Sequence, residues 1–198
     1  MLKIGLEKEF FIQKDGQYVI APPGLPYDES GLLAEARGQA FNCPVEAVYS
    51  LNADIYKLNT KAKELSVNLF DNPIAIIPRQ LKVKASRQFA KGLTKYENLY
   101  GHQYHRNNRS ENTAGIHISF TKPLKHIEDK VEFDYFSMFD WVQIFRQLDA
   151  EFKDEIKSSK RQPGFYELKP DGRIEYRSLP SNTDLNKIIE ILNKILKA

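Results

Sequence analysis

Two strand-like segments near the end of the chain flank a tight turn, and this arrangement restricts the possible folds more than any other feature. FYELKP (165–170) and RIEYRSL (173–179) meet at the Pro-Asp-Gly sequence of residues 170–172, which favours a hairpin turn. KIGLEKEFFI, at about residues 3–12, also alternates like a strand and continues through KDGQ toward a second hairpin. Because hairpins join antiparallel neighbours, we predict a largely antiparallel sheet.

Three segments have the three-to-four-residue apolar spacing of amphipathic helices. They are residues 44–65, residues 133–156, which we predict as one long helix, and the C-terminal segment from Leu185, which Asn182 or Thr183 is expected to cap. Further strands are predicted within GLLAEAR, SVNLF, PIAII and AGIHISF. The combination predicts an α+β fold in which helices pack on one side of the antiparallel sheet.

The composition is that of an ordinary globular domain. A chain of 198 residues with 41% hydrophobic residues can bury a core, and this length predicts one domain over residues 1–198. No stretch reaches the roughly 18 apolar residues of a membrane span, and acidic residues occur close to the start, so we expect no membrane association and a cytoplasmic location. The net charge of +3 does not favour nucleic acid as a partner, and the single cysteine, Cys43, excludes an internal disulfide.

Carboxylates occupy one face of the predicted sheet. In the first strand, Glu7 and Glu9 lie on the face opposite the apolar residues, and Glu35 and Glu175 hold similar positions in two other strands. A pair such as Glu7 and Glu9 alone is typical of a hydrated sheet surface. The same side chains are also suited to bind Mg²⁺, which prefers carboxylate and phosphate oxygens as ligands. Four carboxylates on three strands can therefore line one metal-binding surface.

Two arginines and one histidine are predicted on the same face. Arg173 and Arg177 flank Glu175, and guanidinium groups bind phosphate oxygens in a bidentate manner. The ordinary alternative is a surface ladder of ion pairs, each of little energetic value. His117, in GIHISF, also lies opposite the apolar residues of its strand, although a single histidine in a strand is more often a packing residue. The sharper hypothesis is a site for a phosphate group and its metal ion.

The three motifs GLEKEF, GIHISF and YELKPDGRIEYRS, in this order, resemble those of the glutamine-synthetase-like carboxylate-amine ligases. The resemblance is closest to the COOH-NH2 ligase type 2 group, which is often phage-encoded, so that the expected location is the cytoplasm of the host cell. It implies an antiparallel sheet that forms an open funnel with helices on its outer side. It also implies ATP and Mg²⁺ as cofactors, and a reaction that activates a small-molecule or peptide carboxylate as an acyl phosphate for attack by an amine.

The resemblance also implies roles for individual residues. The implied metal ligands are Glu7, Glu9, Glu35 and Glu175. The implied catalytic residues are Glu175, Arg177, His117 and Arg173, and the implied contacts to ATP are Arg173, Arg177 and Arg37. Ser119 stands where relatives often carry a second histidine. No P-loop or dinucleotide-binding glycine motif offers another way to hold ATP.

Two other functions remain open from the sequence. The first is a nucleic-acid-binding module built on the basic stretch 79–109, for which a solvated basic loop is the plain alternative. Its basic and aromatic residues are Arg79, Lys82, Lys84, Arg87, Lys91, Lys95, Arg106 and Arg109, with Phe89, Tyr96, Tyr100 and Tyr104 between them. The second is a degenerate ligase relative that binds partners without turnover, which Ser119 would suit.

Overall fold

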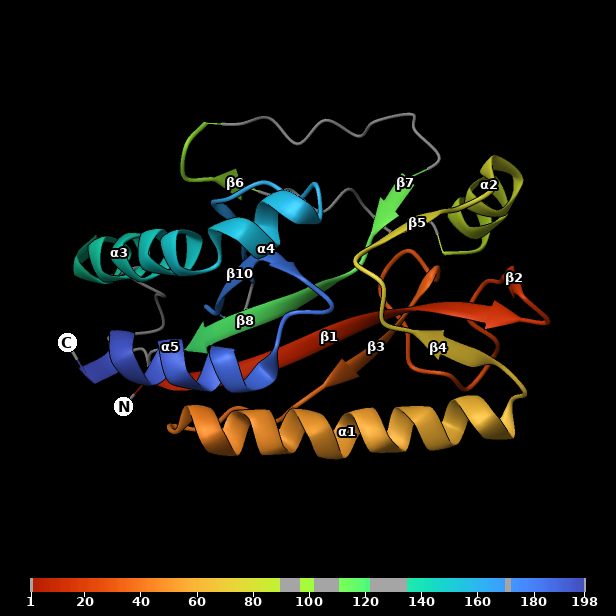
Figure 1. The fold of residues 1–198 in the computed structure, drawn as a ribbon, viewed down its shortest axis with the longest axis horizontal. Coiled ribbons are helices and arrows are strands. Elements are labelled where there is room, and N and C mark those ends of the chain that lie inside the picture. The colour runs from red at the N-terminus through yellow and green to blue at the C-terminus, as the bar shows by residue number, and fades with distance from the viewer. Residues whose placement is uncertain (1, 90–96, 102–110, 122–134, 170–171, 198) are drawn as a thin grey trace, which may run out of the picture.

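The long first strand, β1 (Lys3–Lys14), organises the fold (Figure 1). The computed structural model describes residues 2–89, 97–101, 111–121, 135–169 and 172–197, with the backbone alone for 135–140 and 197. Within this part of the chain, all strand pairs are antiparallel, and the main sheet has the order β2-β1-β8-β10-β9-β6, with β3 and β4 also paired to β1. The predicted α+β class with a largely antiparallel sheet is therefore confirmed.

The remaining elements follow in chain order. The other strands of the main sheet are β2 (Gln17–Tyr18), β3 (Leu33–Arg37), β4 (Asn68–Phe70), β6 (Glu97–Asn98), β8 (Gly115–Thr121), β9 (Phe165–Leu168) and β10 (Ile174–Pro180). A separate pair consists of β5 (Ile74–Ile76) and β7 (Glu111–Thr113). The helices are α1 (Pro44–Glu64), α2 (Arg79–Gln88), α3 (Tyr135–Glu151), α4 (Lys153–Ser158) and α5 (Leu185–Lys197).

The main core lies between the sheet and helices α1, α3, α4 and α5. As the alternation predicts, Ile4, Leu6, Phe10 and Ile12 of β1 all point into this core. Lys8 has the same parity and is also buried, where its Nζ lies 2.7 Å from Asp71 Oδ2. Of the helices in the described residues, none combines the length and the apolar character that crossing a membrane requires.

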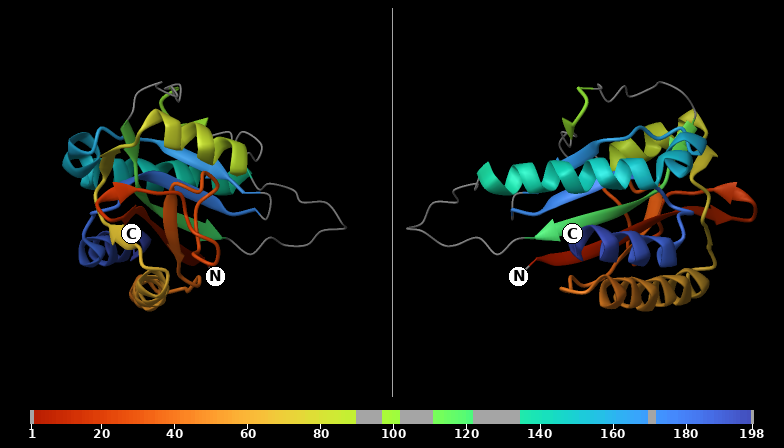
Figure 2. Two further views of the ribbon diagram at one scale, coloured as in Figure 1. Left: turned by 90° about the vertical axis from the view of Figure 1, so that its right-hand side faces the viewer. Right: turned by 60° about the vertical axis from the view of Figure 1, so that its left-hand side comes forward.

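Helix α2 packs on the opposite face of the sheet, which corrects the prediction that the helices share one side. Leu81 and Ala85 of this helix, with Phe89 directly after it, belong to a second apolar cluster with Phe11 and Leu33. Phe11 and Leu33 alternate with core residues, so they project from the carboxylate-bearing face. Figure 2 shows α1 and α2 with strands between them. The carboxylate face is therefore closed by apolar packing at one end.

Two helix boundaries also differ from the predictions. The predicted single helix over 133–156 is divided into α3 and α4 at Phe152, which is fully buried, while residues 133–134 lie outside the described part. The cap of α5 is Asp184, whose Oδ1 accepts a hydrogen bond from the Asn186 N–H at 2.9 Å. Thr183 instead donates its hydroxyl to the Pro180 carbonyl at 2.8 Å, so that neither of the predicted residues caps the helix.

Strand register brings the polar residues of the sheet together. The cross-strand neighbours are Glu7 with His117, Glu7 with Arg37, Glu9 with Glu35, and Ser119 with Glu175. Residues directly opposite each other in antiparallel strands share a face, and their Cβ atoms lie about 5 Å apart. The pairing of β3, β1, β8 and β10 therefore builds one continuous polar surface from segments far apart in the sequence.

Candidate metal centre

His117 is at the centre of this polar surface. It is 1% exposed, and its Nδ1 lies 3.7 Å from Glu7 Oε2 and 3.5 Å from Glu175 Oε1. Its Nε2 lies 3.6 Å from Glu9 Oε1. These separations are longer than a hydrogen bond, so both ring nitrogens lack a hydrogen-bond partner among the described residues. A buried imidazole surrounded by carboxylates but bonded to none of them has the environment of a metal ligand.

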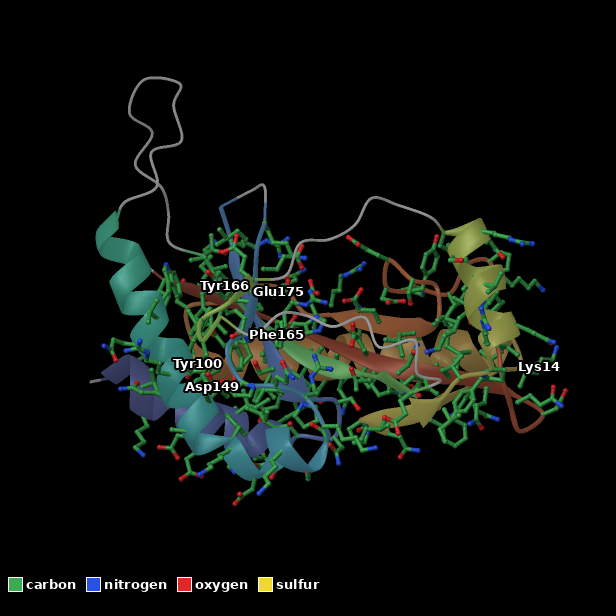
Figure 3. All side chains as sticks on the ribbon, turned by 90° about the horizontal axis from the view of Figure 1, so that it is seen from above. Lys14, Tyr100, Asp149, Phe165, Tyr166 and Glu175 are labelled. Carbon is green, nitrogen blue, oxygen red and sulfur yellow. The ribbon has the colours of Figure 1, made fainter. Side chains whose placement is uncertain are left out.

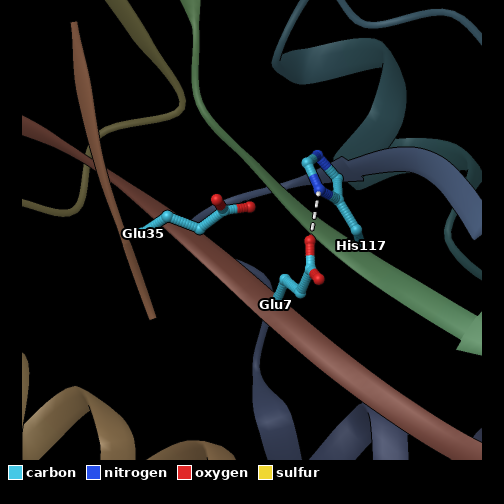
Figure 4. A group of neighbouring side chains, drawn as sticks. All are labelled: Glu7, Glu35 and His117. Atoms are coloured by element: carbon cyan, nitrogen blue, oxygen red, sulfur yellow. Dashed lines mark ion pairs between the residues drawn. The ribbon is translucent and has the colours of Figure 1, made fainter. Parts of the chain in front are cut away.

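Glu7 and Glu35 form a three-residue cluster with His117 (Figure 4). One ligand atom from each side chain lies within 4.8 Å of the other two. Burial acts to raise the pKa of Glu7, but His117, a hydrogen bond with Glu35 and the charge of Arg37 outweigh it and lower this pKa to about 2. Burial, followed by the charge of Glu7, raises the pKa of Glu35 to about 9. At neutral pH the two carboxyl groups therefore hold one proton between them.

Arg37 lies at the rim of this cluster. Its guanidinium group donates a hydrogen bond to Glu35, and its Nε lies 3.8 Å from Glu7 Oε1. The side chain is 54% exposed, and the backbone N–H of Arg37 is held by Asp54 Oδ2 at 2.9 Å. Arg37 is thus placed to offset the negative charge of Glu7 and Glu35 while remaining accessible from solvent.

Glu9 has a different environment from Glu7. Its Oε2 accepts a buried hydrogen bond from the Gly115 N–H at 2.7 Å, and its Oε1 faces His117 Nε2. Glu9 does not belong to the three-residue cluster that places ligand atoms within reach of one cation. One of the predicted metal ligands therefore already has a backbone partner and approaches the histidine from the other side of the ring.

Glu175 lies on β10 and has no exposed surface. Its Oε1 accepts a hydrogen bond from Arg177, and its Oε2 accepts one from the Ser119 hydroxyl at 3.4 Å. Lys169 Nζ lies 3.5 Å from the same Oε2. The predicted pairing of Glu175 with Arg177 is present, and Ser119 binds the carboxylate rather than replacing a ring nitrogen.

Glu167 and Lys169 extend this group of charges, and the sequence reasoning missed both. Glu167 is opposite Glu175 in the register of β9 and β10, and its Oε2 lies 2.8 Å from Lys169 Nζ and 3.0 Å from Arg177 Nη1. The signal for them was the alternation within YELK, which gives Glu167 and Lys169 one parity and the apolar Tyr166 and Leu168 the other. Only the hairpin register shows that they share a face with Glu175.

Arg177 lies at a β-bulge in β10. The register between β8 and β10 shifts between Tyr176 and Leu179, so that two residues of β10 lie opposite His117. A bulge redirects side chains and frees backbone groups from the strand ladder. The carbonyl of Arg177 accepts a hydrogen bond from the guanidinium group of Arg161 instead.

Arg161 is a second residue that sequence reasoning missed. It lies between α4 and β9, and its guanidinium group fills the space beside Gly115 in which a side chain would otherwise lie. A Cβ atom at position 115 would approach the Arg161 nitrogens to 2.7 Å. This contact explains why glycine precedes His117 by two positions, because a larger residue would displace the arginine.

Arg173, which was predicted to bind phosphate, is half-buried just before β10. The backbone carbonyl of Arg173 accepts a hydrogen bond from the Lys169 N–H at 2.9 Å. This hydrogen bond joins the two ends of the hairpin turn that contains Gly172. Gly172 has a positive φ of 82°, as the predicted turn requires, while residues 170–171 lie outside the described part.

Asp28 adds a carboxylate that the sequence reasoning did not assign to the site. It lies in the loop before β3, where its Oδ1 accepts hydrogen bonds from the Ser30 hydroxyl and the Leu33 N–H. Burial, followed by the nearby charge of Glu9, raises the pKa of Asp28 to about 6. No periodic pattern marks this residue, because a loop brings it to the sheet.

A separate hydrogen-bond network supports β10 from the helix side. Asp149 of α3 accepts hydrogen bonds from the Tyr176 hydroxyl at 2.6 Å, the Tyr100 hydroxyl at 2.8 Å and the Gly164 N–H at 3.0 Å. Figure 3 shows Tyr100 close to Asp149, which is part of α3. Tyr176 is adjacent to Glu175 in sequence, so this network fixes the strand segment that carries the buried carboxylate.

The donor set of the cluster fits a divalent cation. Carboxylates suit Mg²⁺ and Mn²⁺, and an imidazole nitrogen favours the transition metal ion over Mg²⁺. The unpartnered nitrogens of buried His117 are the observation that supports this fit. A scan against protein-family models and a search among curated proteins found no match to this chain. The resemblance to carboxylate-amine ligases therefore rests on the sequence motifs and remains a prediction.

Proposed function

We propose that this protein is an ATP- and divalent-metal-dependent ligase that joins a carboxylate to an amine. The observation that carries the proposal is the position of His117, which is buried, lacks hydrogen-bond partners among the described residues and is surrounded by carboxylates from β1 and β10. Leaving such a polar group unpaired is costly unless a ligand completes its bonding. The motif resemblance and the antiparallel sheet, taken as the wall of an open funnel, agree with this function.

Glu7, Glu35 and His117 would hold the cation, with Glu175 beside them. A divalent cation at this position neutralises phosphate oxygens during phosphoryl transfer. The carboxylates of these residues would otherwise repel a triphosphate, since like charges a few ångströms apart in a buried site interact strongly. Binding of the nucleotide is therefore expected to depend on the cation.

The basic residues would contact the transferred phosphoryl group. In the proposed reaction, an oxygen of the substrate carboxylate attacks the γ-phosphorus of ATP, ADP leaves, and an acyl phosphate forms. The amine nitrogen then attacks the acyl carbon, inorganic phosphate leaves, and the nitrogen loses a proton. Arg177 already bridges Glu167 and Glu175, so that its guanidinium group is held in place to stabilise charge on the phosphate oxygens. Arg173 and Lys169 stand at the same end of the face.

Hydroxylamine tests this proposal without knowledge of the natural amine. An acyl phosphate reacts with hydroxylamine to give a hydroxamate, which forms a coloured complex with ferric ions. Incubation with ATP, Mn²⁺ and pools of carboxylic acids should give a hydroxamate and equal amounts of ADP and phosphate for at least one pool. The Glu175→Gln protein is the matched comparison and should give less hydroxamate, since the change removes one charge from the site and preserves the shape of the side chain.

Two results would contradict the ligase. Phosphate release that does not depend on any carboxylate would indicate a simple ATPase. Cation and ATP binding without hydroxamate from any pool would favour the alternative of a binding protein that has lost turnover. The second result would leave the metal centre intact and refute only the reaction.

A further inference from the structure

Glu9 and His117 define an arrangement that the predicted roles do not include. The sequence motifs place Glu9 among the metal ligands, yet its carboxylate lies on the Nε2 side of His117 while Glu7 and Glu175 lie on the Nδ1 side. An imidazole can offer one lone pair to a cation while its other nitrogen donates a proton to a hydrogen-bond acceptor. The two sides of the ring therefore serve different purposes in a metal centre.

We propose that Glu9 is a positioning residue that holds the proton of His117 on Nε2 and so presents the Nδ1 lone pair to the cation held by Glu7 and Glu35. This inference rests on the proposed metal-dependent function. Glu9 Oε1 lies 3.6 Å from Nε2, so a shift of less than an ångström closes the hydrogen bond. Nδ1 faces the carboxylates of two strands, as a ligand nitrogen should.

Glu9 is anchored in a way that suits this role. Its second carboxylate oxygen is occupied by the buried Gly115 N–H at 2.7 Å, which fixes the side chain along β8. The guanidinium group of Arg161 packs against Gly115, in the space that a Cβ atom would occupy. A Cβ atom at this position would lie 2.7 Å from the Arg161 nitrogens. A positive charge on that side disfavours a second cation next to Glu9. Glu9 therefore faces the ring rather than a metal ion.

The substitution Glu9→Gln gives opposite results for a positioning residue and for a ligand. The amide oxygen of glutamine would accept the Gly115 N–H, which leaves the amide NH₂ directed at His117 Nε2. Since two donors cannot face each other, the ring proton would move to Nδ1 and block the lone pair that binds the cation. A direct ligand would lose affinity on the same substitution without any change in the ring proton.

Nitrogen NMR of histidine side chains measures the position of this proton. The experiment uses the metal-free full-length protein, labelled with ¹⁵N at histidine, at a pH at which the ring is neutral. His117 is assigned by comparison with the His117→Asn protein. The parent should carry the proton on Nε2, and Glu9→Gln should carry it on Nδ1 with affinity for Mn²⁺ reduced about tenfold or more, as expected when a partner of a ligand histidine is lost. Glu64→Gln, the same change on exposed α1, should alter neither.

Three results would overturn the inference. They are a parent ring protonated on Nδ1, a parent ring that remains charged throughout the accessible pH range, and a Glu9→Gln protein with an unchanged ring proton. If Glu9→Gln fails to fold, the parent spectrum still decides, because it needs no substitution. Neither measurement uses ATP or a substrate, so absence of hydroxamate formation would refute the ligase while leaving the role of Glu9 supported.

Discussion

Removing the ionisable group of Glu35 should abolish the proton release that accompanies cation binding. With a pKa of about 9, this carboxyl group holds a proton at pH 7 and shares it with Glu7. Only about 1% of it is ionised at that pH, which follows from the two-unit difference between pH and pKa. A cation that uses both carboxylates must displace the proton, so binding and proton release are coupled.

The size of the effect follows from this pKa. Between pH 6 and 8, each Mn²⁺ ion should release about one proton from the parent, and the affinity should rise about tenfold per pH unit before levelling near pH 9. Titration calorimetry in two buffers with different ionisation enthalpies gives the number of protons directly. The Glu35→Gln protein should release almost none, and its affinity should vary little with pH.

Two outcomes would refute this reasoning. If the parent binds Mn²⁺ without releasing protons, Glu35 is not the protonated partner of Glu7. If Glu35→Gln still releases one proton per ion, the proton comes from another group. Glu64→Gln provides the matched control, because it makes the same chemical change on the exposed surface of α1.

Three further predictions concern the same face of the sheet. Without metal, the free energy of unfolding should fall by up to about 1.4 kcal/mol per pH unit between pH 6 and 9, because the folded state keeps a proton on Glu35 that the unfolded state releases near pH 4.5. Urea denaturation should show this slope in the parent and should not show it in the Glu35→Gln protein. Glu175→Gln should weaken metal-dependent ATP binding, which calorimetry measures. Arg177→Lys loses the guanidinium group that can bind phosphate in a bidentate manner, so it should lower turnover, measured as hydroxamate formation, more than ATP affinity. Both variants behaving like the parent in these assays would contradict the prediction. Gly115→Ala should destabilise by about 1 kcal/mol or more by displacing Arg161, while Gly5→Ala, whose Cβ would lie 3.6 Å from the nearest atom, should be neutral in thermal denaturation; equal melting temperatures would argue against the Arg161 contact.

Strand parity made much of the site predictable from the sequence. Glu7, Glu9, Glu35 and Glu175 each alternate along their strands with residues of the main core, so that burial of the core set places the glutamates on the second face. His117 follows the same rule in β8. The hairpin signals predicted only the neighbours β1–β2 and β9–β10. The pairings that bring the carboxylates and the histidine onto one surface, β1 with β3, β1 with β8 and β8 with β10, join segments far apart in the sequence.

Contacts between segments distant in sequence were not predictable in this way. Glu167 is identified only by the register of β9 against β10, and Asp28 and Arg161 reach the sheet from loops, which have no periodic pattern. The distinct role of Glu9 depends on the backbone N–H of Gly115, which the sequence does not display. The same limit explains α2, whose apolar residues do not indicate which face of the sheet they cover.

Calorimetric titration of ATP into the metal-free protein tests the metal-dependent nucleotide site most directly. The titration should be run once with Mn²⁺ or Mg²⁺ and once with EDTA. Because the carboxylates of Glu7, Glu35 and Glu175 surround His117, ATP should bind only when a cation is present, and the Glu175→Gln protein should bind more weakly. Equal ATP affinity with EDTA and with the cation would contradict the metal centre and the ligase function built on it.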